Sequence, residues 1–429
     1  MGIIIKNTTV MTVDKDNRIL ENTNVYIEGN KIVHIGSEYE GFVMDTTIDG
    51  KYKLVMPGLI NAHTHLGMSL FRNYADDMPL FDWLSKKIWP LEAKLNRKDI
   101  YWGSLLSMAE MIETGTTAFC DMYFLMEEVA NGMAESGMRG VLTRGIIEEK
   151  NDPDKKLNES INLFRDYNNG LNGKIKVMLA PHAIYTNSPD FLRRISNLAK
   201  ELDIGLHIHL SETKKEVEDS YNQYGKSPIK LSEELGLFEN HTLAAHCVHI
   251  DDEDIKILLD NNVYPINNPG SNLKLASGFS PVDKMLKKGV KVSLGTDGAS
   301  SNNNLNMFKE MNLAALINKA INLDALSVSA RDAINMATIN GAYALNWEDE
   351  IGSIEVGKKA DLILVDISGS NYYPRHNIES QIAYSSNGKD VNTVIIDGEI
   401  IYKNKEFIKL DIERVKHMAD LQIRDLIQR

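Results

Sequence analysis

Strand-like hydrophobic runs alternate with amphipathic helical stretches through the middle of the chain. In stretches such as residues 191–202 and 252–262, apolar residues recur at every third or fourth position, which is typical of a helix with one buried face. Eight strand-like runs lie between such stretches, at residues 58–65, 116–123, 139–147, 174–182, 204–210, 242–249, 262–267 and 290–297. Eight parallel strands joined by helices close into a barrel, so this pattern predicts an α/β fold of the (β/α)8 TIM-like type.

The two ends of the chain have a different pattern. Short alternating segments separated by Asn, Gly and Asp occupy residues 1–57, and similar segments recur at 351–367 and 391–407. We expect the termini to meet in one accessory domain, a small β-sandwich, whose N-terminal part suits an antiparallel sheet. The expected division is 1–57 for the first part of the sandwich, 58–352 for the barrel and 353–429 for the rest. Residues 411–429 have helical spacing and are expected to form a terminal helix.

Polar residues are placed where a barrel would use them. Active sites of such barrels collect at the C-terminal ends of the strands. The polar residues that stand out at or near the ends of the candidate strands are His63, His65, Arg144, His182, His209, His246 and Asp297. The sequence therefore predicts that these side chains meet at one mouth of the barrel.

Four of these residues suit a metal ion. His63 and His65 are two apart on a strand, so both imidazoles face the same way, and His209 adds a third nitrogen ligand. Asp297 supplies a carboxylate, and no lysine is evident that would bridge two metals, which favours a single ion. Each feature alone also fits a structural role without a metal ion: a pair of core histidines, or an aspartate in a turn before glycine. Their combination in chain order makes the metal reading specific.

Two further residues are candidates for moving and orienting a proton. Glu212 follows His209 by three residues, just beyond the strand, where its carboxylate can lean over the ion as a proton shuttle. His246 lies in a very apolar strand and either hydrogen-bonds the attacking hydroxide or is a satisfied core histidine; we favour the first. His207 shares the face of His209 but lies deeper, where it could simply fill the barrel.

Composition and charge exclude several classes of function. The chain has 43% hydrophobic residues, enough for a large core, and 60 acidic against 47 basic residues, a formal charge of −13. Such a surface repels phosphate backbones and anionic lipids, so nucleic acids and membranes are not expected partners. The first residues, MGIIIKNTTVMTVD, lack the basic start and long apolar run of a secretory signal. With only two cysteines, Cys120 and Cys247, there is no disulfide framework, and a cytoplasmic location is expected.

Several segments resemble a known family. The runs are VMPGLINAHTHLGMSLFRNYADDMPLFDWL (55–84), HIHLSET (207–213), LAAHCVH (243–249) and SLGTDGASSNNNLNM (293–307). Together they resemble the amidohydrolase superfamily and, within it, most closely the 5′-methylthioadenosine/S-adenosylhomocysteine deaminases. The resemblance implies one Zn²⁺ per subunit and deamination of a 5′-modified adenosine. It implies the following roles: metal ligands at His63, His65, His209 and Asp297; catalytic groups at Glu212, His246 and Asp297; and substrate contacts at Glu92, Arg144, His182, Glu212 and Asp297.

Other readings stay open at this point. Guanine deaminases and triazine chlorohydrolases share much of the motif set, and a barrel kept as a scaffold after loss of catalysis would have lost metal ligands that this chain retains. The chain also departs from relatives that place a second arginine soon after the one at the third strand: here the following stretch offers Lys150, Lys155 and Lys156. Lysine gives a point charge and not a planar fork, which favours a small 5′ group over the homocysteine arm. Whether Trp83 or Trp89 contacts substrate, and whether the chain forms a homo-oligomer, is left open.

Overall fold

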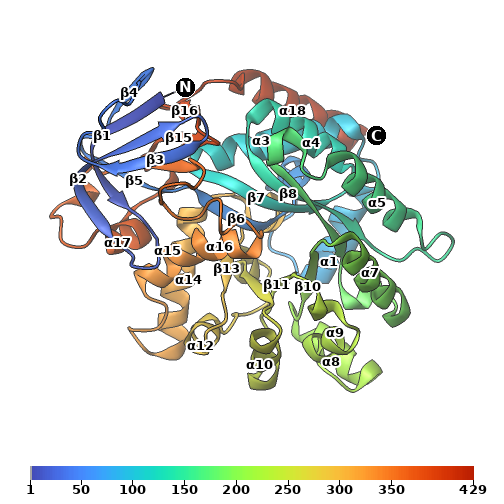
Figure 1. Ribbon diagram of the computed structural model, residues 1–429. Coiled ribbons are helices and arrows are strands. Elements are labelled where there is room, and N and C mark those ends of the chain that lie inside the picture. The colour runs from blue at the N-terminus through green and yellow to red at the C-terminus, as the bar shows by residue number, and fades with distance from the viewer. Residues whose placement is uncertain (1) are drawn as a thin grey trace.

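The computed structural model describes residues 2–429, and its centre is a barrel of eight parallel strands (Figure 1). The strands follow chain order around the barrel: β6 (Leu59–Thr64), β7 (Thr116–Tyr123), β8 (Arg139–Ile146), β9 (Ile175–Pro181), β10 (Leu206–Leu210), β11 (Thr242–His246), β12 (Tyr264–Asn267) and β13 (Ser293–Leu294). All eight expected strands are confirmed. Nearly every strand residue is buried, because the barrel interior covers one face and the surrounding helices cover the other.

Helices connect consecutive strands and form the outer layer of the barrel (Figure 1). The longer helices are α3 (Arg97–Glu113), α4 (Met126–Ser136), α5 (Lys155–Tyr167), α7 (Pro189–Leu202), α8 (Lys214–Tyr224), α9 (Pro228–Glu234), α10 (Asp252–Asp260), α12 (Val282–Lys287), α14 (Met307–Asn322), α15 (Ala330–Met336) and α16 (Ile339–Ala344). Their ends follow local sequence signals. The hydroxyl of Ser188, for example, accepts a hydrogen bond from Phe191 N (3.3 Å) and caps α7, which has proline as its first residue.

The barrel closes between its first and eighth strands through an unusual seam. The eighth strand was expected at 290–297, but only Ser293–Leu294 forms a regular ladder. Beyond Leu294, the side chain of Asn61 replaces strand pairing: its Oδ1 accepts from Thr296 N (2.9 Å) and its Nδ2 donates to Thr296 Oγ1 (2.7 Å). Asp297 N then donates to His63 O (3.0 Å). The seam therefore places Asp297 directly beside His63.

Strands from both termini join in one accessory sheet, as expected. Its order is β17 (Glu406–Phe407), β16 (Glu399–Lys403), β15 (Val391–Ile396), β14 (Leu362–Asp366), β5 (Lys53–Pro57), β1 (Gly2–Met11), β2 (Ile19–Glu28) and β3 (Lys31–Gly36), with β4 (Thr46–Asp49) paired to β1. The sheet is mixed, because the chain returns after β3 so that β4 and β5 run parallel to β1. The expected division at 57/58 and 352/353 stays a prediction.

The expected terminal helix is α18 (Ile412–Gln428), and it packs against α3 of the barrel. Arg429, which follows it, donates to Asp99 Oδ1 (2.7 Å) at the start of α3. Among residues 2–429, no helix combines the length and the apolar character that crossing a bilayer requires.

A buried ion pair ties the base of the barrel to the accessory sheet. Arg139 begins β8, and its Nε lies 2.8 Å from Oδ2 of Asp361, just before β14. Its Nη2 lies 3.2 Å from Oδ1 of Asp397, between β15 and β16. The side chains of Arg139 and Asp361 are almost completely buried (0% and 1% exposed), so neither charge has water as an alternative partner.

We expect Arg139→Ala to lower the free energy of unfolding by about 3–5 kcal/mol, because it leaves a buried carboxylate without its partner. The matched control is Arg193→Ala on α7, whose partner Asp190 is 95% exposed and whose loss should cost less than about 1 kcal/mol. Urea unfolding followed by circular dichroism measures both. Equal effects of the two substitutions would contradict the role given to Arg139.

Candidate metal centre and active site

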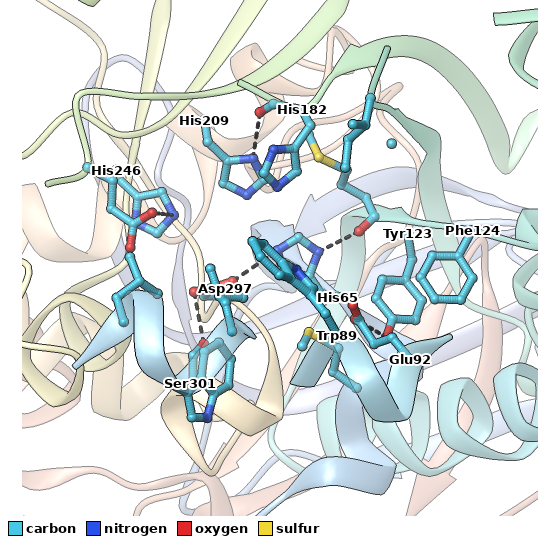
Figure 2. Close-up of a pocket in the computed structure, with 18 of the residues that line it drawn as sticks. His65, Trp89, Glu92, Tyr123, Phe124, His182, His209, His246, Asp297 and Ser301 are labelled. Atoms are coloured by element: carbon cyan, nitrogen blue, oxygen red, sulfur yellow. Dashed lines mark hydrogen bonds and ion pairs between the residues drawn. The ribbon is translucent and has the colours of Figure 1, made fainter. Parts of the chain in front are cut away.

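A cavity of about 260 Å³ opens at the C-terminal ends of the barrel strands (Figure 2). Its lining brings together residues that the sequence analysis singled out: His65, Glu92, Arg144, His182, His209, Glu212, His246 and Asp297. His63 lies outside this lining, fully buried next to the same cluster. All the candidate site residues therefore meet at one mouth of the barrel, while their individual roles stay predictions.

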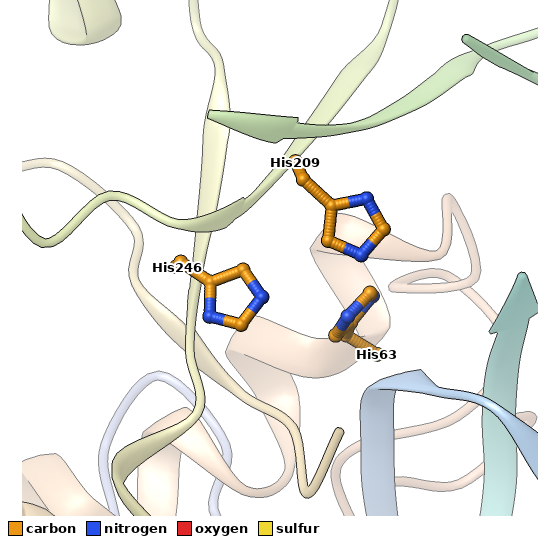
Figure 3. Close-up of side chains that lie close together, drawn as sticks. All are labelled: His63, His209 and His246. Atoms are coloured by element: carbon orange, nitrogen blue, oxygen red, sulfur yellow. The ribbon is translucent and has the colours of Figure 1, made fainter. Parts of the chain in front are cut away.

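Four imidazoles and one carboxylate lie close together at the base of the cavity. The ring centroid of His63 lies 4.9 Å from that of His65 and 4.8 Å from that of His209. Oδ1 of Asp297 is 3.1 Å from Nε2 of His65 and 3.5 Å from Nε2 of His63. His246 approaches from β11, and Figure 3 shows its ring turned toward those of His63 and His209. Two overlapping sets of ligand atoms thus share His63: one with His65 and Asp297, the other with His209 and His246.

The orientation of the imidazoles fits a metal ion. Nδ1 of His65 donates to the carbonyl oxygen of Met122, and Nδ1 of His209 donates to that of His182 (2.9 Å). Carbonyls only accept, so Nδ1 carries a hydrogen on both rings and Nε2 is the nitrogen that each ring can offer to an ion. Nε2 of His63 is buried and has no hydrogen-bond partner in the structure. An unpaired buried nitrogen needs an explanation, and a cation held by three imidazoles and a carboxylate supplies one, with the ligand types that zinc prefers.

Burial keeps most of these imidazoles neutral. It lowers the pKa of His63 to about 3 and that of His182 to about 4, and it holds the pKa of His209 well below its usual value. His65 is the exception. Burial opposes its charge as well, but the hydrogen bond and the charge of Asp297 outweigh burial and raise the pKa of His65 to about 9. Without an ion, the proton on His65 thus supplies the positive charge that Asp297 faces.

Three hydrogen-bond donors hold the carboxylate of Asp297 in place. The hydroxyls of Ser271 and Ser301 donate to its Oδ2 (2.6 and 2.9 Å), and Gly298 N donates to Oδ1 (2.8 Å). Burial favours the neutral acid, but the ring nitrogens of His63 and His65 next to its Oδ1 outweigh burial and hold the pKa of Asp297 well below its usual value. The sequence analysis missed both serines. Ser301 lies four residues after Asp297 in the same glycine- and serine-rich segment, which is the one signal that pointed to it.

Glu212 is fixed by a second, buried carboxylate. Glu216 on α8 accepts hydrogen bonds from the main-chain nitrogens of Ser211 (2.9 Å) and Glu212 (2.8 Å). Burial raises the pKa of Glu216 to about 7. Oε2 of Glu212 lies 3.9 Å from Nε2 of His246. Its Oε1 accepts a hydrogen bond from the hydroxyl of Ser277 (3.2 Å). Glu216 is one helical turn beyond Glu212 and was not identified from the sequence.

His246 is oriented from behind by an amide. Its Nδ1 lies 2.8 Å from Oδ1 of Asn272, on the short helix α11 (Pro269–Lys274). An amide oxygen accepts, so Nδ1 of His246 carries the hydrogen and Nε2 faces the cavity with its lone pair. The φ of His246 is 75°, in the left-handed region. A non-glycine residue is retained there at a cost of roughly 1–3 kcal/mol, which is common at functional sites.

Glu92 lies at the opposite side of the cavity from His246 (Figure 2). It ends the short helix α2 (Trp89–Glu92), and its Oε1 accepts from the hydroxyl of Tyr123 (2.6 Å). Burial raises the pKa of Glu92. Tyr123 was also missed, although it is the last residue of an expected strand, where polar groups were the signal sought. Trp89 lines the cavity and remains 45% exposed, while Trp83, also in the lining, is buried and donates through Nε1 to Ala75 O (2.9 Å).

The cationic groups of the cavity are already paired. Arg144 Nε lies 2.7 Å from Oε2 of Glu159, and Lys156 Nζ lies 2.9 Å from Oε1 of Glu149. Both cations line the cavity, and both carboxylates are about 40% exposed. Each of these two pairs is therefore close to neutral.

Comparisons with known proteins agree with this geometry. A 5-methylthioadenosine/S-adenosylhomocysteine deaminase from Thermoanaerobacter pseudethanolicus is 56% identical over 431 residues, covering 100% of both chains. The structure of an adenosine deaminase from Xanthomonas campestris with bound zinc has a TM-score of 0.95 and 34% identity, covering 99% of this chain and 98% of that one. An atrazine chlorohydrolase from Arthrobacter aurescens shares the fold, with a TM-score of 0.92 at 23% identity over 98% of this chain and 100% of that one.

The match to a family profile covers the whole barrel and part of the accessory sheet. The Amidohydrolase family profile matches residues 54–401, from β5 of the accessory sheet through the whole barrel to β16. Together with the full-length relative and the histidine cluster in the barrel, this match shows that the chain belongs to the amidohydrolase family.

Proposed function

We propose that this protein deaminates the adenine ring of 5′-methylthioadenosine, S-adenosylhomocysteine or a related 5′-modified adenosine, giving the inosine analogue and ammonia. The observation that carries the proposal is the arrangement of one cavity: a cluster of metal-ligand type at its base, Glu212 beside it and Glu92 at the far side. The full-length relative of the same named activity supports it. The main alternative is another amidohydrolase reaction, such as guanine deamination or triazine dechlorination.

The proposed cofactor is one zinc ion per subunit, held by His63, His65, His209 and Asp297. When bound, such an ion lowers the pKa of a coordinated water from 15.7 to about 7 and so makes a nucleophile available at neutral pH. Support comes from the unpaired Nε2 of His63, the ionised Asp297 and the zinc in the Xanthomonas relative. We further propose a cytoplasmic setting, consistent with the two buried free thiols, and leave the subunit number open.

Glu212 is the proposed acid and base. Its carboxylate accepts a proton from the attacking water and passes it to N1 of the adenine ring, so that the oxygen can add at C6. The second hydrogen of the attacking water is accepted by the lone pair of His246 Nε2 or by the carboxylate of Asp297, which orients the water. Once the amino group at C6 receives a proton, it leaves as ammonia and the 6-oxo purine remains. Water supplies the oxygen and the hydrogens gained, so the reaction balances without an oxidant or reductant.

The sugar end of the substrate is assigned to the other side of the cavity. Glu92 would accept hydrogen bonds from the ribose hydroxyls with its Oε2 and the remaining lone pair of Oε1, since Tyr123 occupies only one acceptor position. His182 and Arg144 complete the substrate contacts. Because Arg144 and Lys156 are already paired with Glu159 and Glu149, we propose that a small uncharged 5′ group is preferred over the homocysteine arm.

We expect Glu212→Gln to lower kcat by about 10²–10⁴, because the amide cannot carry a proton between water and N1. Zinc content per chain should stay unchanged, since Glu212 is not a proposed ligand. The matched control is Glu218→Gln on α8, a residue of the same type that is 59% exposed and should leave both quantities unchanged. Full activity of Glu212→Gln would rule out the assigned role.

A substrate panel tests the activity itself. We expect the zinc-loaded protein to release ammonia from 5′-methylthioadenosine and adenosine, less readily from S-adenosylhomocysteine, and not from guanine or an aminotriazine. Removal of the ribose hydroxyls in 2′,3′-dideoxyadenosine should lower kcat/KM by about 10- to 100-fold, as expected for lost hydrogen bonds to a charged acceptor. In Glu92→Gln this difference between adenosine and its dideoxy analogue should shrink. Preference for guanine or a triazine would favour the alternative function.

Zinc binding should release a proton from His65. At about pH 6 a coordinated water keeps its protons and the imidazoles of His63 and His209 are neutral, whereas His65, with a pKa of about 9, is protonated. We expect release of about one proton per zinc, seen as a dependence of the calorimetric binding enthalpy on the ionisation enthalpy of the buffer. Because the proton competes with the ion, affinity should fall by about tenfold for each unit that the pH drops below 9. Binding without proton release would contradict the His65–Asp297 pairing.

A further inference from the structure

His207 is a buried histidine to which the proposed reaction gives no role. It lies on β10, two residues before His209, on the same face of the strand but deeper in the barrel. Its side chain is fully buried and does not line the cavity. Its Nε2 lies 2.9 Å from Nδ1 of His63, with the two ring planes at 87°. His207 therefore contacts a proposed metal ligand from the side away from the substrate.

The three proposed imidazole ligands differ in what holds them. Nδ1 of His65 and Nδ1 of His209 each donate to a main-chain carbonyl, and a carbonyl accepts under all conditions. Nδ1 of His63 meets an imidazole nitrogen, which accepts in one tautomer and donates in the other. The orientation of the hydrogen on His63 consequently depends on the tautomer of His207.

The surroundings of His207 determine that tautomer. The hydroxyl of Thr143 lies 2.8 Å from the carbonyl oxygen of Asp121, which can only accept, so the hydroxyl donates there. Nδ1 of His207 lies 3.3 Å from the same hydroxyl oxygen, whose hydrogen is already committed, so toward Thr143 this Nδ1 acts as the donor. The thiol of Cys120, 3.4 Å from this nitrogen, is a weaker donor and acceptor than a hydroxyl and does not reverse this direction.

The direction of the whole chain follows. With its hydrogen on Nδ1, His207 has a lone pair on Nε2, and Nδ1 of His63 donates to it. The hydrogen of His63 is then on Nδ1. Its Nε2, the buried nitrogen that has no hydrogen-bond partner in the structure, carries the lone pair, which points away from His207. Among residues 2–429, no ion pair or hydrogen bond joins His207 to a carboxylate, so nothing favours a second proton on its ring.

We propose that His207 is a positioning residue that fixes the tautomer and the ring orientation of His63, and so prepares one of the three nitrogens for the metal ion. The inference rests on the proposed metal centre but not on the identity of the substrate. Without an acceptor at this place, the Nδ1 hydrogen of His63 is buried and unpaired. The ring is then driven toward the other tautomer, which directs a hydrogen at the metal position.

The test compares two substitutions that fill similar space. His207→Leu removes the acceptor, whereas His207→Gln offers an amide oxygen toward His63 and an amide N–H toward Thr143. Cys120→Ala is the control for packing, because Cys120 contacts His207 in the same part of the barrel but does not touch His63. Zinc affinity is measured by competition with a chromogenic chelator, and thermal unfolding is followed with and without zinc, in both cases without substrate.

We expect His207→Leu to weaken zinc binding by about 10- to 100-fold and to shrink the rise in Tm that zinc produces, as for other groups that orient metal-bound histidines. His207→Gln should bind zinc within a few fold of the unmodified protein, and Cys120→Ala should match it. If His207→Leu does not fold, the comparison moves to His207→Asn, whose amide is too short to reach His63 and should bind zinc as weakly.

Unchanged affinity in His207→Leu overturns the inference. So does a loss in His207→Gln and Cys120→Ala as large as in His207→Leu, because packing alone would then be responsible. If the unmodified protein binds zinc but deaminates none of the adenosines, the proposed function is wrong. The test of His207 can still be interpreted in that case, because it measures only zinc affinity and the effect of zinc on Tm.

Discussion

The hydrogen bonds that join the first and last strands of the barrel are the constraint on which the site depends. The main-chain nitrogen of Asp297 donates to the carbonyl oxygen of His63, and Asn61 holds the preceding residue in place. Asp297 belongs to the last barrel segment and His63 to the first, more than 200 residues apart, so only closure of the barrel brings the carboxylate to the imidazoles. The left-handed φ of Asp297 (61°) then turns its side chain inward at a cost of roughly 1–3 kcal/mol, which the closed barrel can hold in place.

Charge in the cavity is balanced locally. Neutral imidazoles and one ionised carboxylate form the base, where a divalent cation would be stabilised, and the proton on His65 balances Asp297 in its absence. Elsewhere in the cavity lining, Arg144 and Lys156 are each neutralised by a glutamate.

Much of the fold could be predicted because barrel strands leave a simple signature. Strands buried on both faces read as short apolar runs, and all eight were found, as were helices such as α7 and α10. The residues at strand ends, including His65, His182 and His246, stood out because polar groups are rare there. The parallel pairing of β4 and β5 with β1 could not be predicted, because it depends on how the chain returns over the sheet and not on the local pattern.

The partners of the site residues were harder to find. Ser271, Asn272 and Glu216 lie on loops and helices, and no spacing rule marks a serine or a glutamate that will meet a carboxylate or a main-chain nitrogen in the folded protein. His207 was visible in the sequence, yet its contact with His63 joins two strands that are not neighbours in the barrel. Such contacts across the barrel interior appear only once the strands are placed in three dimensions.

The central claim is that His63, His65, His209 and Asp297 converge on a single ion. X-ray absorption spectroscopy of the zinc-loaded protein tests it most directly, together with the zinc content per chain. We expect one zinc per chain, nitrogen and oxygen ligands at about 2.0–2.2 Å and the outer scattering of several imidazole rings. A sulfur ligand at about 2.3 Å, a second metal at about 3.5–4 Å, or zinc that binds without imidazole scattering would contradict it.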